Sequence, residues 1–304
     1  IRVAARAAIL VAPFACAVLA ASSADAADNA RSYGIANFGM PGQCGTPGMT
    51  HPVHVATAKA FTDQFFWMKQ VQFWGTTSNT FNSGAGANLF TDPARQATCA
   101  SNNNNVCSAN DNTQAGIDNV AVSFVHTHAG HNPSSNSFFS MGNTSSGCNA
   151  ATDTNFLLGD TATAGASEIA VMKACQGADL GVWQGGGYKK MVQNSSRFSM
   201  WNGFHGDSSC GGSTADYVAD YAASSMVEGA GENWIDDAFD SDSSGDDCPV
   251  SIVFGNTKAN RKAMFTHGGF GDRKLTNVSK SGSTYFFVSG CKPPVGTGVT
   301  LPTQ

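Results

Sequence analysis

Two short apolar segments, each leading into a reactive side chain, constrain most strongly what this chain can fold into. The first is residues 119–124, which lead through Val125 into three histidines, and the second is residues 168–173, which lead into Cys175. Apolar runs of this length, bounded by polar residues and glycine, are typical of buried strands. Functional side chains gather where the strands of a parallel sheet end. We therefore expect an α/β domain that brings the histidines and Cys175 together.

The remaining pattern also favours an α/β domain, because strands alternate with helices and long loops. The stretches rich in Gly, Pro, Asn or Ser are predicted to be irregular or looped. We read residues 27–118 as an N-terminal extension and 119–304 as the α/β domain; the sequence leaves open whether they form one unit. The other predicted strands are 197–204, 249–254 and 284–288; the predicted helices are 54–70, 214–227 and 232–239; the predicted irregular stretches are 27–51, 75–116 and 132–147.

The N-terminus has the organisation of a secretory signal peptide. Arg2 and Arg6 precede the apolar run 7–20, which is too short to span a bilayer, and Ala24-Asp25-Ala26 offers a cleavage site. We expect cleavage after Ala26, and a mature protein that is soluble, extracellular and not membrane-bound.

The composition limits the kinds of molecule that this chain can bind. The 304 residues carry only 13% charged side chains and a net charge of -5, which argues against nucleic acid as a ligand. We expect a protein or peptide as the substrate.

Eight of the nine cysteines remain once Cys16 leaves with the signal peptide. An even number in an oxidising compartment indicates disulfides, and Cys99 and Cys107 form the expected local pair. A nucleophilic Cys175 would leave one other cysteine unpaired, whereas a fully paired set would make Cys175 structural. The sequence leaves both possibilities open.

Cys175 and the histidines suit covalent catalysis. An imidazole near a strand-end thiol takes its proton, and the thiolate then attacks an acyl carbon. His131, directly after Gly130, is the preferred base and His128 the alternative. Backbone amides near Gly177 or Gly130 are the predicted oxyanion donors.

The same histidines also permit metal chemistry. His126, His128 and His131 have the spacing H-x-H-x-x-H, which resembles the zinc motif H-x-H-x-D-H of metallo-β-lactamase-like hydrolases, with Gly130 in place of Asp. This predicts zinc as an alternative cofactor.

Two further histidines are candidates for the cleft. His205 and His267 each stand beside glycine after an apolar run, and either is a possible distant zinc ligand.

An acidic segment resembles half of a calcium loop. Asp240, Asp242 and Ser244 precede Gly245 in the order D-x-D-x-[DN]-G, although loop position 12 is Ser251 instead of Glu. Calcium is therefore a second possible cofactor.

The segment Ala174-Cys175-Gln176-Gly177 is similar to the caspase signature Q-A-C-[RQG]-G, with Lys173 in place of Gln. Over residues 120–273 the chain resembles secreted microbial proteins that share a domain of unknown function and are similar to caspase and gingipain peptidases. The motifs that carry the resemblance, in order, are the His-rich strand end, Leu158-Gly159-Asp160, Glu168, Ala174-Cys175, Trp183, 201–205, 233–238 and 267–273.

This resemblance implies a caspase-like three-layer sandwich, with a mainly parallel sheet and helices on both faces. It also implies a secreted cysteine hydrolase, a peptidase with a His/Cys dyad that needs no cofactor. Two alternatives remain: a non-catalytic binding or structural protein with Cys175 in a disulfide, and a zinc hydrolase that uses the histidine cluster.

Overall fold

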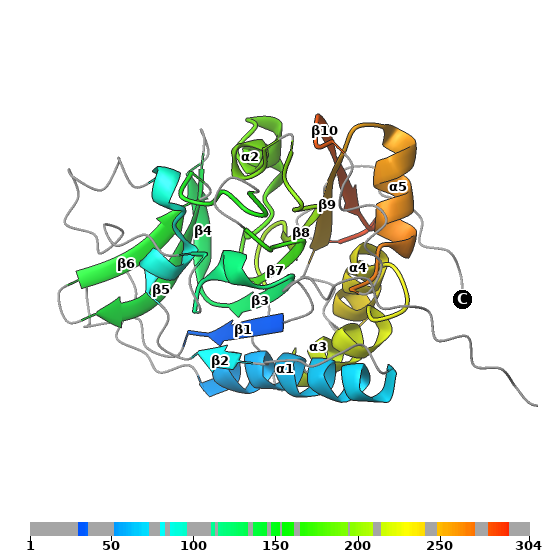
Figure 1. Ribbon diagram of the computed structural model, residues 1–304, viewed down its shortest axis with the longest axis horizontal. Coiled ribbons are helices and arrows are strands. Elements are labelled where there is room, and N and C mark those ends of the chain that lie inside the picture. The colour runs from blue at the N-terminus through cyan, green and yellow to red at the C-terminus, as the bar shows by residue number, and fades with distance from the viewer. Residues whose placement is uncertain are drawn as a thin grey trace, which may run out of the picture.

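A twisted seven-stranded sheet forms the centre of the molecule, with strand order β10-β9-β8-β7-β3-β1-β2 (Figure 1). The computed structural model describes residues 30–35, 52–72, 80–82, 86–95, 111–112, 115–132, 136–144, 147–152, 154–160, 165–193, 195–208, 214–240, 248–270 and 279–291. The strands of this sheet are β1 Ala30–Gly34, β2 Thr80–Asn82, β3 Val122–His126, β7 Ile169–Lys173, β8 Met200–Phe204, β9 Pro249–Gly255 and β10 Gly282–Phe287.

Most of the sheet is parallel. Strands β2, β1, β3, β7 and β8 are each parallel to their neighbours, β9 is antiparallel to β8, and β10 is antiparallel to β9. The expected α/β class with a mainly parallel sheet is therefore confirmed.

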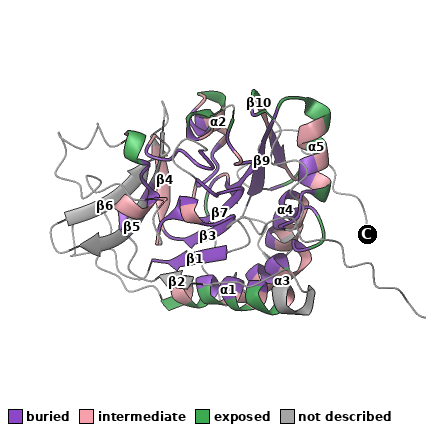
Figure 2. Ribbon diagram, in the orientation of Figure 1, coloured by how far each residue is buried: buried purple, intermediate pink, exposed green. Residues whose placement is uncertain are grey.

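Alternate residues of the strands point to two separate cores. In β7, Ile169 and Val171 belong to one core, and Ala170 and Met172 belong to the other. This alternation follows from the two-residue period of an extended strand. All five residues of β7 are buried, as expected for a strand covered on both faces (Figure 2).

Four helices cover one face of the sheet: α1 Pro52–Gln72, α3 Thr214–Ser224, α4 Ala230–Asp240 and α5 Lys258–His267. Phe61 of α1, Tyr221 of α3 and Trp234 of α4 pack with Phe124 of the sheet in this core. Pro52 begins α1, where its missing N–H leaves no hydrogen bond unmade.

The other face is covered by shorter elements. Val182 of α2 (Leu180–Gln184), Tyr188 of the 3-10 helix η6 (Tyr188–Met191) and Phe90 of η2 (Ala87–Phe90) belong to the second core, together with Trp201 of β8. Phe139 belongs to the same core and comes from a second, antiparallel sheet, β4 Ala129–Asn132, β5 Asn136–Thr144 and β6 Gly147–Thr152.

Some sequence-based expectations about local structure were wrong. The stretch 27–51, predicted to be irregular, contains β1, which pairs with β3 inside the main sheet. The stretch 132–147, predicted to be a loop, contains β5, and the stretch 75–116 contains β2 and η2. Helices α2 and α5 were not predicted. These strands are short or carry many Asn, Ser and Gly residues, so their apolar signal is weak.

A disulfide, Cys248–Cys291, joins the residue before β9 to the segment after β10. The predicted Cys99–Cys107 pair and the predicted signal peptide 1–26 lie outside the described residues. None of the described helices combines the length and the hydropathy needed to cross a bilayer.

Candidate active site at the carboxyl ends of the parallel strands

Three neighbouring parallel strands deliver the candidate residues to one edge of the sheet. The register of β3 and β7 pairs His126 with Lys173, so the segments that leave these strands start at the same height. Strand β8 lies parallel to β7 on the other side. His131 follows β3, Cys175 follows β7 and His205 follows β8.

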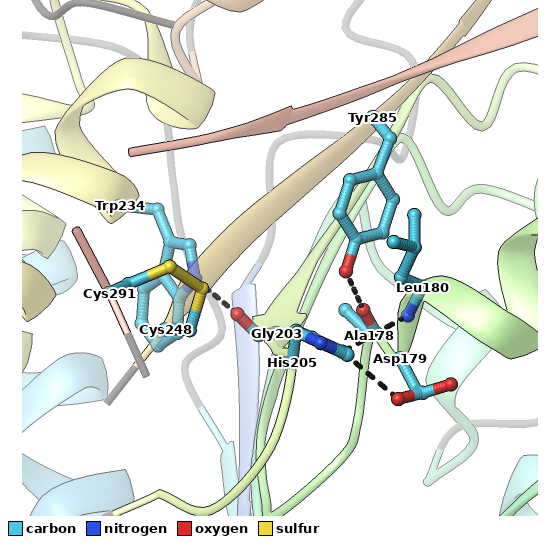
Figure 3. Close-up of a disulfide and its surroundings, with 9 residues drawn as sticks. All are labelled: Ala178, Asp179, Leu180, Gly203, His205, Trp234, Cys248, Tyr285 and Cys291. Carbon is cyan, nitrogen blue, oxygen red and sulfur yellow. Dashed lines mark hydrogen bonds and ion pairs between the residues drawn. A yellow bond between two sulfur atoms is a disulfide. The ribbon is translucent and has the colours of Figure 1, made fainter. Parts of the chain in front are cut away.

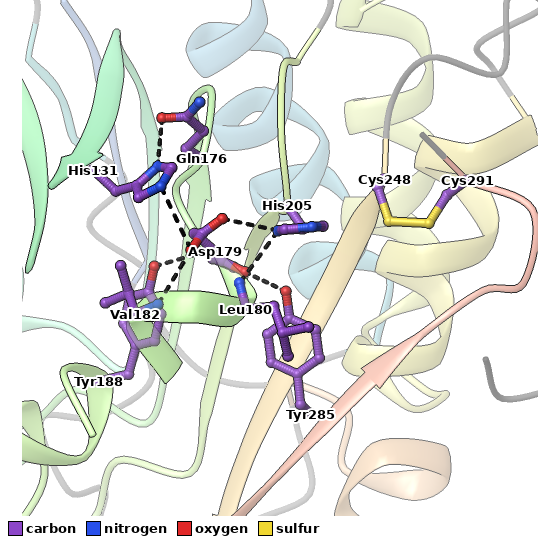
Figure 4. A network of polar contacts seen from close by, with 11 residues as sticks. His131, Gln176, Asp179, Leu180, Val182, Tyr188, His205, Cys248, Tyr285 and Cys291 are labelled. Carbon is purple, nitrogen blue, oxygen red and sulfur yellow. Dashed lines mark hydrogen bonds and ion pairs between the residues drawn. A yellow bond between two sulfur atoms is a disulfide. The ribbon is translucent and has the colours of Figure 1, made fainter. Parts of the chain in front are cut away.

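The Asp179 carboxylate lies between two of these histidines (Figure 4). Its Oδ2 atom lies 2.9 Å from His205 Nδ1, and its Oδ1 atom lies 3.9 Å from His131 Nε2. Oδ1 also accepts a 3.1 Å hydrogen bond from the Val182 amide, which makes Asp179 the N-cap of α2. The Asp179 amide donates to Tyr188 Oη at 2.9 Å, so both its backbone and its side chain are fixed.

The charge state of Asp179 follows from these contacts. Burial alone would raise the pKa of Asp179, but the hydrogen bond from His205, the hydrogen bond from the Val182 amide and the electrostatic attraction of the two neighbouring histidines together lower it. The carboxylate is therefore ionised, and the Nδ1 atom of His205 must carry a hydrogen to bond it. In the neutral ring, that tautomer leaves the lone pair on Nε2 of His205. The Leu180 amide lies 3.2 Å from Nδ1, but an Nδ1 atom that carries a hydrogen has no lone pair to accept a hydrogen bond from it.

Residues of and next to strands β9 and β10 hold the backbone on both sides of Asp179, at Ala178 and at His205 (Figure 3). Tyr285 Oη of β10 donates to the Ala178 carbonyl at 2.5 Å. The His205 amide donates to the Cys248 carbonyl at 2.8 Å, and Cys248 is fixed by its disulfide to Cys291.

The turn after Cys175 contacts His131 directly. Gln176 Oε1 lies 2.7 Å from His131 Nδ1, so Nδ1–H donates to the amide oxygen and Nε2 keeps its lone pair. Gln176 has φ of +55°, and among the described residues it is the one non-glycine with a positive φ. Such a backbone costs energy for a residue with a Cβ, and strained residues cluster at functional sites.

The Cys175 side chain is a partly exposed thiol and belongs to no disulfide. Its Sγ accepts a hydrogen bond from the Ser208 amide at 3.4 Å and lies 3.8 Å from the Ser208 carbonyl. The alternative that places Cys175 in a disulfide is therefore not supported.

His126 and His128 do not join His131. Their rings contact His54 at the start of α1, with ring centroids 4.0 Å and 5.2 Å away. His131 instead contacts Gln176 and Asp179. The three histidines predicted to share a zinc ion therefore contact two different groups of residues. The described part of the chain holds no group of three or more His, Cys, Asp or Glu side chains arranged to bind a metal ion.

Other predicted site residues have different positions. His267 is exposed at the end of α5 and interacts electrostatically with Glu232 of α4. The Gly177 amide donates to the Ala174 carbonyl at 3.1 Å, which commits it to the turn. Gly130 lies in β4 opposite Phe138. In the predicted calcium loop, Asp240 ends α4, while Asp242 and Ser244 lie outside the described residues.

Sequence reasoning missed Asp179 and Gln176. A local signal existed for Asp179, because Asp before an apolar run is a common N-cap. Nothing local identified Gln176, whose partner is 45 residues away.

We compared the chain with protein-family models, with curated proteins and with solved structures, and no match was found in any of the three comparisons.

Proposed function

We propose that this protein is a secreted cysteine peptidase with a caspase-like three-layer arrangement, in which Cys175 is the nucleophile and His131 the general base. One observation carries the proposal most directly. The residue after a strand-end thiol adopts a strained backbone and contacts the ring of His131, which lies in β4, the strand that follows β3 in the chain. A nucleophile, a base and a group that orients the base are the parts that covalent acyl transfer needs.

The proton path follows from the tautomer of His131. Its Nε2 lone pair accepts the proton of the Cys175 thiol, which gives a thiolate and an imidazolium. In this structure His131 contacts Gln176 and Asp179, and the proposed proton transfer requires its Nε2 to reach the sulfur. Asp179 lies 3.9 Å from Nε2 and stabilises the imidazolium that forms.

The thiolate then attacks the carbonyl carbon of a peptide bond. A carbon–sulfur bond forms, the C–N bond breaks, and the imidazolium returns its proton to the leaving amine. Water that has lost a proton to His131 releases the acyl group and restores the thiol. Each step balances without a metal or an organic cofactor.

His205 supports the site from the other side of Asp179. The 2.9 Å contact holds the carboxylate in one orientation, while the N-cap bond holds it against α2. Because the Nδ1 of His205 faces a carboxylate, as the base does in many hydrolases, His205 is the rival candidate for the base.

Hydrolysis of a fluorogenic peptide library by purified protein tests both assignments. We expect Cys175→Ala to abolish cleavage, His131→Ala to lower kcat/KM by about 10³-fold, and His205→Ala to lower it less. The matched control is His267→Ala, which removes an exposed histidine at the end of α5 and should leave cleavage unchanged. Undiminished cleavage by Cys175→Ala would end the proposal, and a larger loss in His205→Ala than in His131→Ala would transfer the role of base.

A further inference from the structure

Lys173, the last residue of β7, is fully buried two positions before Cys175. Burying an ammonium group is costly unless its charge is compensated. Nζ of Lys173 lies 4.8 Å from the centroid of the Phe204 ring and 5.7 Å from that of Tyr217. Aromatic faces attract cations at these distances. Two aromatic rings therefore stabilise a positive charge in the core between the sheet and the helices.

The same ammonium contacts the residue that holds the thiol. Lys173 Nζ donates a hydrogen bond to Ser208 Oγ. The Ser208 amide in turn donates to Cys175 Sγ at 3.4 Å. Ser208 is itself nearly buried, and its carbonyl also lies 3.8 Å from Cys175 Sγ, so both polar groups of its backbone lie against the thiol. Lys173, Ser208 and Cys175 thus form a continuous chain from a buried cation to the sulfur.

We propose that Lys173 is a positioning residue for Cys175: it fixes Ser208 so that the Ser208 amide faces the sulfur, and its charge favours the thiolate. The role in catalysis rests on the proposed function, but the effect on the sulfur does not need a substrate. The thiol proton goes to His131 or to water, and no other bond changes. Because the caspase signature has Gln at this position, the proposed role of Lys173 is not implied by the resemblance to caspases.

Several charged groups surround the turn, and they act in different directions. A positive charge nearby favours a thiolate, and a carboxylate disfavours it. The amide of Ser208 adds a donor for the anionic sulfur. The titratable or charged groups around the turn and Lys173 include His131, Asp179, His205, the exposed Asp207, Tyr217 and His126, which pairs with Lys173 across the sheet.

The pH dependence of Cys175 alkylation tests the proposal. Intact protein is treated with iodoacetamide from pH 5 to 10, and the rate is followed by mass at the peptide that contains Cys175. An unperturbed thiol gives a midpoint at about pH 8.5. We expect a lower midpoint in the wild type, a rise of about one pH unit in Lys173→Met, and about tenfold slower alkylation of that variant at pH 6.5. Lys173→Arg should keep the wild-type midpoint.

The exposed Lys189 supplies the matched control, because Lys189→Met removes an equal charge from a side chain that lies in solvent. Ser208→Ala removes the contact with Lys173 but keeps the amide, and should raise the midpoint part of the way. If Lys173→Met does not fold, as judged by circular dichroism, Ser208→Ala decides. An unchanged midpoint in the folded variant overturns the inference.

Failure of the inference is distinct from failure of the peptidase proposal. A shifted midpoint without peptide hydrolysis supports the role of Lys173 and contradicts the proposed function alone. Hydrolysis that depends on Cys175, with the same midpoint in wild type and in folded Lys173→Met, contradicts the inference alone.

Discussion

Replacing Asp118 with Asn should stabilise the folded protein at pH 8 and leave it nearly unchanged at pH 5. Asp118 lies in η5 (Ile117–Asn119), directly before β3, and is fully buried. Its Oδ1 accepts hydrogen bonds from the amides of Gly159 and Ser167 at 2.6 and 3.0 Å. Among the described residues, Oδ2 has no hydrogen-bond partner. Asn keeps an acceptor for both amides and removes the charge.

Burial raises the pKa of Asp118 from 3.8 to about 8, with the two amides opposing and the carboxyls of Asp92 and Asp160 adding to the rise. Asp111 behaves similarly: burial first, then Asp118 and Asp92, raise its pKa to about 8. In the unfolded chain these groups ionise near pH 4. Between pH 4 and 8 the unfolded state therefore binds fewer protons than the folded state, and stability must fall as pH rises.

The size of the effect is bounded by the shift. Each pKa unit corresponds to about 1.36 kcal/mol, so the full shift of Asp118 sets a ceiling on the order of 5 kcal/mol. Because the neighbouring carboxyls titrate together, we expect about 1–3 kcal/mol from Asp118 alone. Lys280, whose pKa burial lowers to about 8 against the attraction of Glu168, acts in the opposite direction above pH 8, so the useful window ends there.

Urea unfolding at pH 5, 6, 7 and 8, in a buffer with a chelator, measures this directly. The wild type should lose stability across the series, and Asp118→Asn should lose less. The surface change Asp63→Asn, at an exposed i,i+4 pair with Lys59, is the matched control and should leave the slope as it is. A wild-type stability that stays level or rises from pH 5 to 8 would refute the reasoning.

Three further predictions concern the core, the disulfide and the site. Phe61→Ala removes a fully buried ring stacked on Phe124 and should lower the free energy of unfolding in urea by about 3–5 kcal/mol. Trp67→Ala, on the exposed side of the same helix, should lower it by less than about 0.5 kcal/mol. Equal losses of stability in the two variants would contradict the packing. Reduction of the Cys248–Cys291 bond, which spans 43 residues, should lower the unfolding free energy by about 2–4 kcal/mol, and an unaltered urea midpoint would disagree with this. Asp179→Asn should lower kcat/KM at least about tenfold with less than about 2 kcal/mol lost in stability, and full activity of a folded variant would show that His131 does not need the carboxylate.

The elements predicted correctly from the sequence are those with a strong apolar pattern. Strand β7, read from Ile169 to Met172, is a continuous apolar run, and β9, read from Pro249, is apolar apart from Ser251, as expected for strands covered on both faces. Strand β1 has Arg31 and Ser32 at buried positions and looks like a loop. Arg31 donates to the Gly116 carbonyl, so its polar group is accommodated by a contact that no local pattern contains.

The candidate site divides in the same way. Cys175 and His131 were predicted because each lies a few residues after a recognisable strand. Asp179 and the orientation of His205 depend on the register between β7 and β8, which sequence spacing alone does not fix. Likewise, the separation of His126 and His128 from His131 arises from the turn into β4, and the H-x-H-x-x-H spacing is equally compatible with a shared metal.

Covalent capture of Cys175 tests the central claim most directly. The native protein is incubated with a panel of peptidyl acyloxymethyl ketones, and the intact mass and the modified residue are determined by mass spectrometry. The account predicts one probe group per molecule on Cys175, formed rapidly in the wild type, slowly in His131→Ala and not in the denatured protein. Modification at another residue, or equal rates in native and denatured protein, would contradict it.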